Sequence, residues 1–312
     1  MPTIDHRLPL VFLMGATATG KTQRACDLAA EFPLDLVSVD STLVYRGMDI
    51  GTAKPDARVL ARHPHRLIDI REPEQAYSAA DFRADALREI ADIHARGRIP
   101  LLVGGTGLYF RALERGLSEM PRADPALRER LAEEVRVYGK LHMHRKLAMC
   151  DARTAARLDA NDVQRVLRAL EVFELSGVPI SEQQGGVRGR LPWRVLKLGL
   201  VAADRSNLRL RIAERFDQML AQGLENELRS LRARPGWSAD LPSMRAVGYR
   251  QGWEWLDGKV SATDFRMHAL HATSQLAKRQ MTWLRSEHDA WLFDCDAAAS
   301  PSRIHAALAA FL

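Results

Sequence analysis

Short apolar runs alternate with amphipathic stretches over the first third of the chain. Four runs are typical of buried strands, and they lie at residues 8–14, 34–40, 65–70 and 98–105. Between them, residues 23–32 and 78–97 are amphipathic in the manner of surface helices. Strands that alternate with helices predict parallel crossovers and therefore an open α/β sheet.

The pattern changes after Gly116. Residues 117–190 are charged and helical in character, with no convincing strand, whereas 193–202 again has the character of a strand. Helices dominate from Asp204 onward, apart from a last short strand that we predict at 290–296. We therefore predict a helical domain, residues 117–190, inserted into an α/β core made of residues 1–116 and 191–312.

Bulk composition narrows the class only slightly. The 312 residues are 46% apolar, enough for one large or two modest domains, and no apolar run reaches the length of a membrane span. The N-terminus lacks the features of a signal peptide, so we expect a cytoplasmic protein that does not engage membranes. Lys plus Arg outnumber Asp plus Glu by 45 to 39, a modest excess that is compatible with a polyanionic partner without demonstrating one.

Cysteine and histidine do not suggest metal or redox chemistry. Cys26, Cys150 and Cys295 are too widely spaced for a zinc knuckle or a CxxC pair. The ten histidines contain no HExxH pattern. We expect three reduced thiols and no metal site built from imidazoles.

The octapeptide GATATGKT matches the pattern GxxxxGK[ST], and it follows a predicted strand and precedes a predicted helix. The predicted phosphate loop comprises Gly15, Ala16, Thr17, Ala18, Thr19, Gly20, Lys21 and Thr22. Its glycines let backbone amides surround an anion, Lys21 adds a full charge, and Thr22 offers a hydroxyl to a magnesium ion. The predicted fold is thus a P-loop NTPase-like parallel sheet with an all-helical insertion.

Two other strand ends carry candidate chemistry. Asp40 ends the second predicted strand, at the edge where open α/β sheets place their ligands, and can bind magnesium or accept a proton. The fourth strand ends in GGTGLY, where Thr106 can donate to a phosphate or a substrate. An ATPase usually carries an acidic residue here, so its absence argues against a nucleotide-hydrolysing motor.

Arg215 lies at the edge of an apolar helical stripe formed by Leu208, Ile212, Phe216 and Met219. A guanidinium in that position needs an anionic partner. The spacing allows either a second phosphate clamp or a structural salt bridge.

Basic residues recur in three later segments. Asn161 and Asp162 can cap a helix that presents Gln164, Arg165 and Arg168 to a polyanion or simply to solvent. Further along, basic side chains alternate with aromatic ones: Arg245, Tyr249, Arg250, Trp253, Lys278, Arg279, Trp283 and Arg285. That mixture suits nucleic acid, but it is also compatible with a helix surface over aromatic core residues.

Taken together, these motifs resemble the tRNA dimethylallyltransferases. The matching blocks run in family order along nearly the whole chain: GATATGKT (15–22), DSTLVYRGMDIGTAKP (40–55), GGTGLY (104–109), NDVQRVLRALEVFELSG (161–177), RAVGYRQ (245–251) and LAKRQMTWLR (276–285). Family members often have Ser where Thr19 stands, and some have Pro where Ala16 stands. Neither difference removes a backbone donor from the loop.

The resemblance implies that the loop holds the pyrophosphate of dimethylallyl diphosphate, with Mg²⁺ as cofactor. It implies transfer of the dimethylallyl group to the exocyclic N6 amine of adenosine 37 of tRNA, with Asp40, Thr106, Lys21 and Arg215 as catalytic residues. The helical insertion would then embrace the anticodon stem-loop. The residues that would line the tRNA side are Asp40, Ser41, Thr42, Leu43, Thr106, Arg128, Gln164, Arg165, Val166, Leu167, Arg168, Arg245, Ala246, Val247, Gly248, Tyr249, Arg250, Lys278, Arg279, Gln280 and Arg285. No dimerisation signal stands out, so we expect a monomer.

Three other functions fit parts of the pattern. A small-molecule P-loop kinase explains the loop and Asp40 but leaves the basic C-terminal third without a purpose. A prenyltransferase acting on free AMP, ADP or ATP shares the chemistry but needs no helical insertion. A non-catalytic RNA-binding module makes the intact phosphate loop superfluous.

Overall fold

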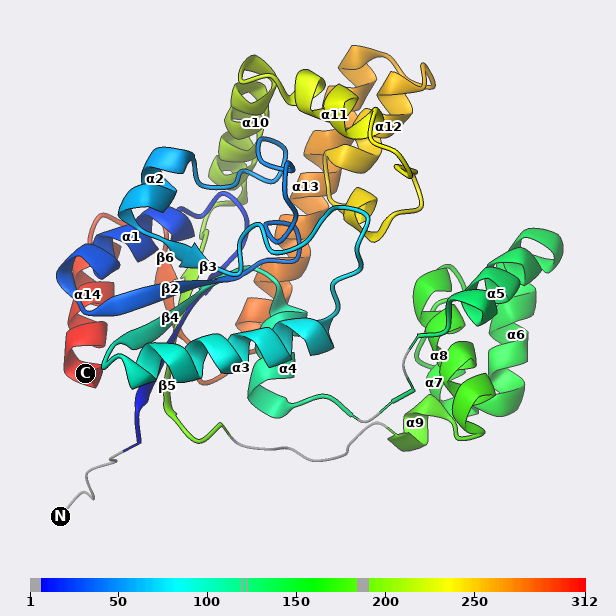
Figure 1. Cartoon of the computed structure of the whole chain (residues 1–312), viewed down its shortest axis with the longest axis horizontal. Coiled ribbons are helices and arrows are strands. Elements are labelled where there is room, and N and C mark those ends of the chain that lie inside the picture. Colours follow the sequence, from blue (N-terminus) through cyan, green and yellow to red (C-terminus); the bar gives the residue numbers. More distant parts are fainter. Residues whose placement is uncertain (1–6, 119, 122, 184–190) are drawn as a thin grey trace. The chain divides into compact units, whose positions relative to one another are not determined.

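The chain divides into two compact units in this computed structural model. One unit combines Met1–Glu114 with Leu191–Leu312, and the other is Arg115–Arg190. The structure describes residues 7–118, 120–121, 123–183 and 191–312 (Figure 1). Within these ranges no helix is both long enough and apolar enough to cross a membrane.

The first unit is built on a six-stranded sheet in the order β3-β2-β4-β1-β5-β6. Its strands are β1 (Pro9–Gly15), β2 (Leu34–Val39), β3 (His65–Arg66), β4 (Ile99–Gly104), β5 (Arg194–Val201) and β6 (Trp291–Asp294). Every neighbouring pair is parallel, which confirms the predicted open α/β sheet.

One strand is shorter than predicted. The apolar run at 65–70 contributes only two residues to the sheet. Leu67 and Asp69 adopt positive φ angles of 64° and 55°, a left-handed conformation that ends extended pairing. Hydrophobicity alone does not reveal this turn.

Helices cover both faces of the sheet and extend beyond it (Figure 1). Those of the first unit are α1 (Lys21–Glu31), α2 (Ala57–Arg62), α3 (Ala79–Ala95), α4 (Gly107–Arg115), α10 (Arg205–Ala221), α11 (Leu224–Arg232), the 3₁₀ turn η1 (Pro242–Arg245), α12 (Tyr249–Leu256), α13 (Ala262–Arg285) and α14 (Ser300–Phe311). The second unit contains α5 (Pro125–Tyr138), α6 (Lys140–Cys150), α7 (Ala152–Ala155), α8 (Val163–Ser176) and α9 (Ile180–Gln183).

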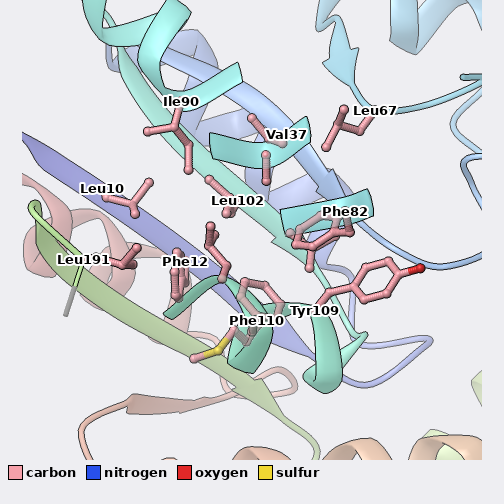
Figure 2. Close-up of a cluster of buried hydrophobic side chains, with 14 of the residues drawn as sticks. Leu10, Phe12, Val37, Leu67, Phe82, Ile90, Leu102, Tyr109, Phe110 and Leu191 are labelled. Carbon is pink, nitrogen blue, oxygen red and sulfur yellow. The ribbon is translucent and has the colours of Figure 1, made fainter. Parts of the chain in front are cut away.

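Alternate side chains of each central strand enter two separate cores. Phe12 of β1 and Leu102 of β4 pack with Phe82 and Ile90 of α3 on one face (Figure 2). Val11 of β1 packs with α1 and α14 on the opposite face. Because both faces are buried, these strands are apolar throughout, which explains the continuous runs in the sequence.

A third core lies among the C-terminal helices of the same unit. Tyr249 of α12 and Phe265 of α13 pack with Phe216 of α10, and the segment after β2 joins them through Val44 and Met48. Helices α10 to α13 are thereby packed against the segment that follows the second strand.

Glu171 of α8 is a buried carboxylate in the helical unit, and its side chain is only 1% exposed. Arg128 donates from Nε and Nη2 at 2.8 and 3.2 Å, and Arg168 donates from Nη1 at 2.6 Å. The Asp124 amide donates a fourth hydrogen bond at 3.1 Å. Glu171 therefore joins α5 to α8.

Removing this acceptor should weaken the helical unit. Glu171→Ala should lower its free energy of unfolding by about 3 kcal/mol, because two guanidinium groups and one amide lose their acceptor. Arg128→Ala should cost only about 1 kcal/mol, since Arg168 stays in place. Hydrogen exchange of the α8 amides in the full chain measures both changes, and equal protection in the two variants would contradict this assignment.

Candidate active site

A cavity of about 640 Å³ opens where the phosphate loop, β2 and β4 end. Parallel pairing brings these ends together, since Gly104 is in register with both Met14 and Val39. The walls come from residues 17–22, 40–43, 51–53, 103–106 and 246–248, with side chains of α10 and α13. All of them belong to the first unit.

The phosphate loop is held in shape by its own side chains and by two left-handed residues. Ala18 and Gly20 have φ angles of 61° and 77°. The buried Thr19 hydroxyl donates to the Ala16 carbonyl at 2.8 Å. A Cβ on Gly15 would lie 2.8 Å from the Leu200 carbonyl oxygen, so only glycine fits there. Thr19 thus braces the loop.

Lys21 lies at the start of α1 and folds back over the loop. Its Nζ donates to the Ala16 carbonyl at 2.6 Å. Burial lowers the pKa of Lys21 to about 8, with Asp40 raising it and Arg215 lowering it further. Because this ammonium group contacts a carbonyl and, among the described residues, no carboxylate, its charge remains available to bind an anion.

Asp40 and Thr106 are fixed beside each other by the loops that carry them. Asp40 Oδ1 accepts from the amide and the hydroxyl of Thr42, at 2.8 and 2.6 Å. Thr106 Oγ1 accepts from the Ser41 amide at 3.2 Å. This arrangement leaves the Thr106 hydroxyl proton and the second Asp40 oxygen available to a ligand.

Arg215 reaches from α10 to the phosphate loop. It donates to Thr17 Oγ1 at 3.3 Å and to the Ala53 carbonyl at 3.5 Å. Burial lowers its pKa, an effect that Asp40 opposes. No carboxylate of the described residues forms an ion pair with Arg215, so the structure does not provide the salt bridge that its spacing allowed.

Gln280 of α13 joins two walls of the cavity, a role that the sequence did not reveal. Its Oε1 accepts from the Thr17 amide at 2.9 Å, and its Nε2 donates to the Gly105 carbonyl at 3.1 Å. A Cβ on Gly105 would lie 2.4 Å from Gln280 Nε2, and one on Gly107 would lie 2.3 Å from the Trp283 ring. The glycines of the GGTG segment therefore allow α13 to approach.

The structure distributes the other expected tRNA-side residues over three environments. Those that line the cavity are Ser41, Thr42, Leu43, Ala246, Val247 and Gly248. Those that are exposed on the first unit are Arg245, Arg250, Lys278, Arg279 and Arg285. Those in the helical unit are Arg128, Gln164, Arg165, Val166, Leu167 and Arg168, of which Val166 is buried.

The aromatic side chains near these basic residues pack inside the protein. Tyr249 is fully buried and Trp253 packs against the same core. The Trp283 ring stacks on Phe110 with 5.8 Å between centroids. These rings serve helix packing, which was the alternative to base stacking.

Oxygen donors for a metal ion are present at the phosphate loop. Thr22 lines the cavity, and its hydroxyl has no hydrogen-bond partner within the described ranges. Magnesium prefers oxygen ligands and keeps several waters beside substrate phosphates, so one hydroxyl with a diphosphate suits it. Asp294, Cys295 and Asp296 form another cluster of possible ligands, but Arg211 already pairs with Asp296.

The parallel sheet, the phosphate loop after its first strand and the cavity at the strand ends define a P-loop α/β protein. The family model described as IPP transferase matches residues 43–287, and the chain belongs to that family. Membership makes the chain a transferase enzyme.

Relatives and solved structures agree with this assignment. The chain is similar to the tRNA dimethylallyltransferase of Alkalilimnicola ehrlichii, with 57% identity over 286 residues, 91% of this chain and 90% of that protein. It is 54% identical to that of Thiobacillus denitrificans over 97% of each chain. The crystal structure of the full-length tRNA isopentenylpyrophosphate transferase from Bacillus halodurans matches with a TM-score of 0.71 and 37% identity, covering 97% of this chain and 96% of that one.

Binding of an anion should depend on the proton of Lys21. In the free protein this side chain loses its charge above about pH 8. The affinity for inorganic pyrophosphate should therefore fall by up to about tenfold per pH unit above that value, because only the ammonium form attracts the anion. Calorimetric titrations between pH 7 and 9.5 would measure the fall. Lys21→Gln should bind pyrophosphate weakly at every pH, and its affinity should not show the fall above about pH 8. If the variant had the same pH profile as the wild type, the titrating group would be one other than Lys21.

Proposed function

We propose that this chain transfers the dimethylallyl group of dimethylallyl diphosphate to N6 of adenosine 37 in tRNA, giving N6-isopentenyladenosine and pyrophosphate. One observation carries the proposal: the phosphate loop and the Asp40 carboxylate line the same cavity. A leaving diphosphate and a proton-bearing nucleophile need that pair of groups together. The family and its curated tRNA dimethylallyltransferases supply the identity of the two substrates.

The phosphate side of the cavity would stabilise the leaving group. As the bond between C1 and its oxygen breaks, negative charge grows on the diphosphate. Loop amides, Lys21 and Arg215 are fixed around the position where that charge would develop. Donors and cations oriented in advance lower the barrier because they need not reorganise during the reaction.

Asp40 and Thr106 would orient the nucleophile. The N6 amine attacks C1, so a carbon–nitrogen bond forms as the carbon–oxygen bond breaks, and Asp40 takes the amine proton. Asp40 is oriented by Thr42. The Thr106 hydroxyl, which accepts from the Ser41 amide, can donate a hydrogen bond to the adenine. An adenine amine is a poor nucleophile, so alignment with the carbon contributes as much as proton removal.

Apolar side chains provide a surface for the dimethylallyl group. Ile212, Phe216 and Met219 of α10 and Leu276 of α13 line the cavity. They can bury the prenyl methyl groups and exclude water from the allylic carbon as it gains positive character.

Magnesium is the cofactor that this site fits. The Thr22 hydroxyl would hold it together with diphosphate oxygens. When bound, the ion would neutralise part of the diphosphate charge.

The exposed basic residues give the tRNA a place to bind. Arg245, Arg250, Lys278, Arg279 and Arg285 form no ion pair within the part of the chain that the structure describes. Their free charge suits backbone phosphates, whose contacts can offset the few kcal/mol needed to flip a base out of its stack. A tRNA substrate also agrees with the expected cytoplasmic location.

A single incubation tests the proposal. The protein is mixed with magnesium, dimethylallyl diphosphate and unmodified tRNA, and the digested RNA is examined by mass spectrometry. Isopentenyladenosine at one tRNA position would support it. Prenylation of added AMP alone would instead indicate an adenylate isopentenyltransferase, and phosphate transfer from ATP would indicate a kinase.

Asp40→Asn should lower kcat roughly 10²- to 10⁴-fold, because the amide cannot accept the amine proton. The KM for dimethylallyl diphosphate should change little, since the amide keeps the hydrogen bonds with Thr42. Steady-state kinetics with both substrates measures the two effects. Wild-type turnover in this variant would remove Asp40 from the mechanism.

Arg215→Ala should lower kcat/KM for dimethylallyl diphosphate roughly 100-fold, because a cation next to the leaving group is lost. Arg209→Ala changes an exposed arginine of the same helix and serves as the matched control. Inorganic pyrophosphate should also bind more weakly to Arg215→Ala. Unchanged turnover and unchanged affinity would show that the clamp assignment is wrong.

A further inference from the structure

Glu227 of α11 accepts an unusual set of hydrogen bonds for a side chain outside the cavity. Its Oε2 accepts from the amides of Asp49 and Ile50, at 2.8 and 2.7 Å. Its Oε1 accepts from the Gly51 amide at 3.1 Å and from the Tyr249 hydroxyl at 2.6 Å. Three consecutive amides around one carboxylate form an anion cradle of the kind that usually receives a ligand.

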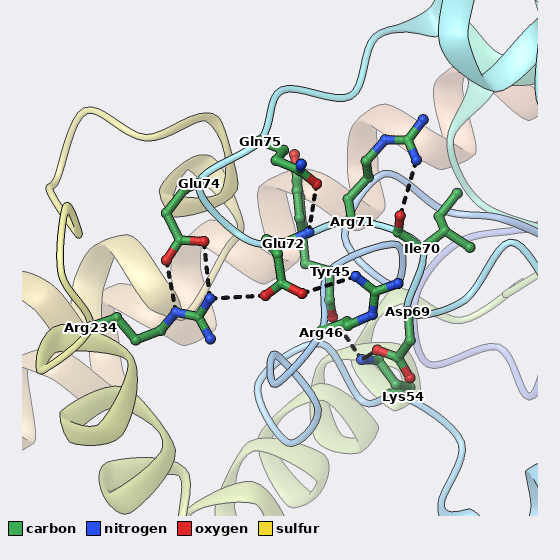
Figure 3. A network of polar contacts seen from close by, with 10 residues as sticks. All are labelled: Tyr45, Arg46, Lys54, Asp69, Ile70, Arg71, Glu72, Glu74, Gln75 and Arg234. Carbon is green, nitrogen blue, oxygen red and sulfur yellow. Dashed lines mark hydrogen bonds and ion pairs between the residues drawn. The ribbon is translucent and has the colours of Figure 1, made fainter.

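The 49–53 loop is held by this cradle and also by Lys54. Lys54 has a side chain only 3% exposed and pairs with Asp49 and Asp69. Figure 3 shows Lys54 with Asp69 and the Tyr45 carbonyl, to which it donates at 2.8 Å. The loop needs this support because Ala53 has a φ of 54°, a costly angle for a residue with a side chain.

The 49–53 loop is connected to the phosphate loop through Arg215. Gly51, Thr52 and Ala53 line the cavity. The Ala53 carbonyl accepts from Arg215, and the same guanidinium donates to Thr17 in the phosphate loop. A shift of the 49–53 loop would therefore move an acceptor that orients Arg215.

The same carboxylate also holds the segment that enters α12. The Tyr249 ring contacts Gly51 so closely that a Cβ on this glycine would lie 2.7 Å from the ring. Ala246, Val247 and Gly248, directly before Tyr249, line the cavity. Glu227 thus connects two walls that belong to distant parts of the chain.

We propose that Glu227 is a positioning residue for prenyl transfer, which sets the 49–53 loop, and through Ala53 the guanidinium of Arg215, against the diphosphate. This inference rests on the proposed function for its kinetic readout. Glu227 itself touches neither substrate; it acts through the backbone amides and Tyr249.

Glu227→Gln is the critical variant because it keeps the size of the side chain. The amide group retains one acceptor oxygen but turns an NH₂ group toward backbone donors. We expect kcat/KM for dimethylallyl diphosphate to fall roughly 100-fold, the effect of a small misplacement of a binding group. The affinity for inorganic pyrophosphate without tRNA should fall as well, while the melting temperature shows that the protein remains folded.

Two further variants calibrate the result. Glu225→Gln removes a carboxylate two residues away, which pairs with Arg229 on the surface of the same helix, and should leave both quantities unchanged. Tyr249→Phe removes one of the four hydrogen bonds and should reduce kcat/KM by a smaller factor, roughly tenfold. A Tyr249→Phe loss as large as that of Glu227→Gln would place the role in the hydroxyl and overturn the amide cradle.

Wild-type kinetics and wild-type pyrophosphate affinity in Glu227→Gln would overturn the proposal. Lower stability with unchanged pyrophosphate affinity would also overturn it, since the role would be structural only. If the wild-type protein makes no prenylated tRNA, the proposed function fails. The pyrophosphate titration then still decides the role of Glu227, because it needs no tRNA.

Discussion

The active-site region depends on positive charge that the protein gathers without neutralising it. Burial lowers the pKa of both Lys21 and Arg215, and the charge of Arg215 lowers the pKa of Lys21 further. Neither forms an ion pair with a carboxylate in the described parts of the chain. Their partners are the Ala16 and Ala53 carbonyls and the Thr17 hydroxyl, which are weaker acceptors for a cation than a carboxylate. A bound diphosphate would therefore give both cations the anionic partner that they lack. The resulting electrostatic stabilisation would grow as negative charge develops on the leaving group.

Glycines in the sequence motifs allow the elements around this charge to come close together. A Cβ on Gly104 would lie 2.0 Å from the Val39 carbonyl oxygen, so β4 can end beside β2 only without a side chain there. Gly105 and Gly107 admit Gln280 and Trp283 of α13, and Gly51 admits the ring of Tyr249. The motif glycines thus act on packing between distant segments as well as on backbone conformation. Any side chain at these positions would separate the walls whose closeness defines the cavity.

The basic residues expected to face the tRNA differ in whether they are paired. In the helical unit, Arg128 and Arg168 share Glu171, and Arg165 pairs with Asp162. On the first unit, exposed residues such as Arg250 and Lys278 have no carboxylate partner within the described ranges. Paired guanidinium groups are oriented in advance but partly neutralised, whereas unpaired ones attract phosphate over a longer range. An RNA bound by these residues would meet both kinds of basic group.

The sheet, the phosphate loop and the helical insertion could be predicted from short stretches of sequence. Burial on both faces of a strand, glycine spacing and helix caps each leave a pattern within a few residues. Asp162 indeed caps α8, and all six predicted strands exist. Only the tertiary structure decided that Arg215 faces the phosphate loop without a salt bridge, that Tyr249 and Trp283 are core residues, and that the third strand ends after Arg66. It alone revealed Glu227 and the bridging contacts of Gln280, whose partners lie up to 178 and 263 positions away in the chain. Such contacts depend on how whole elements pack, and no short stretch of sequence contains that information.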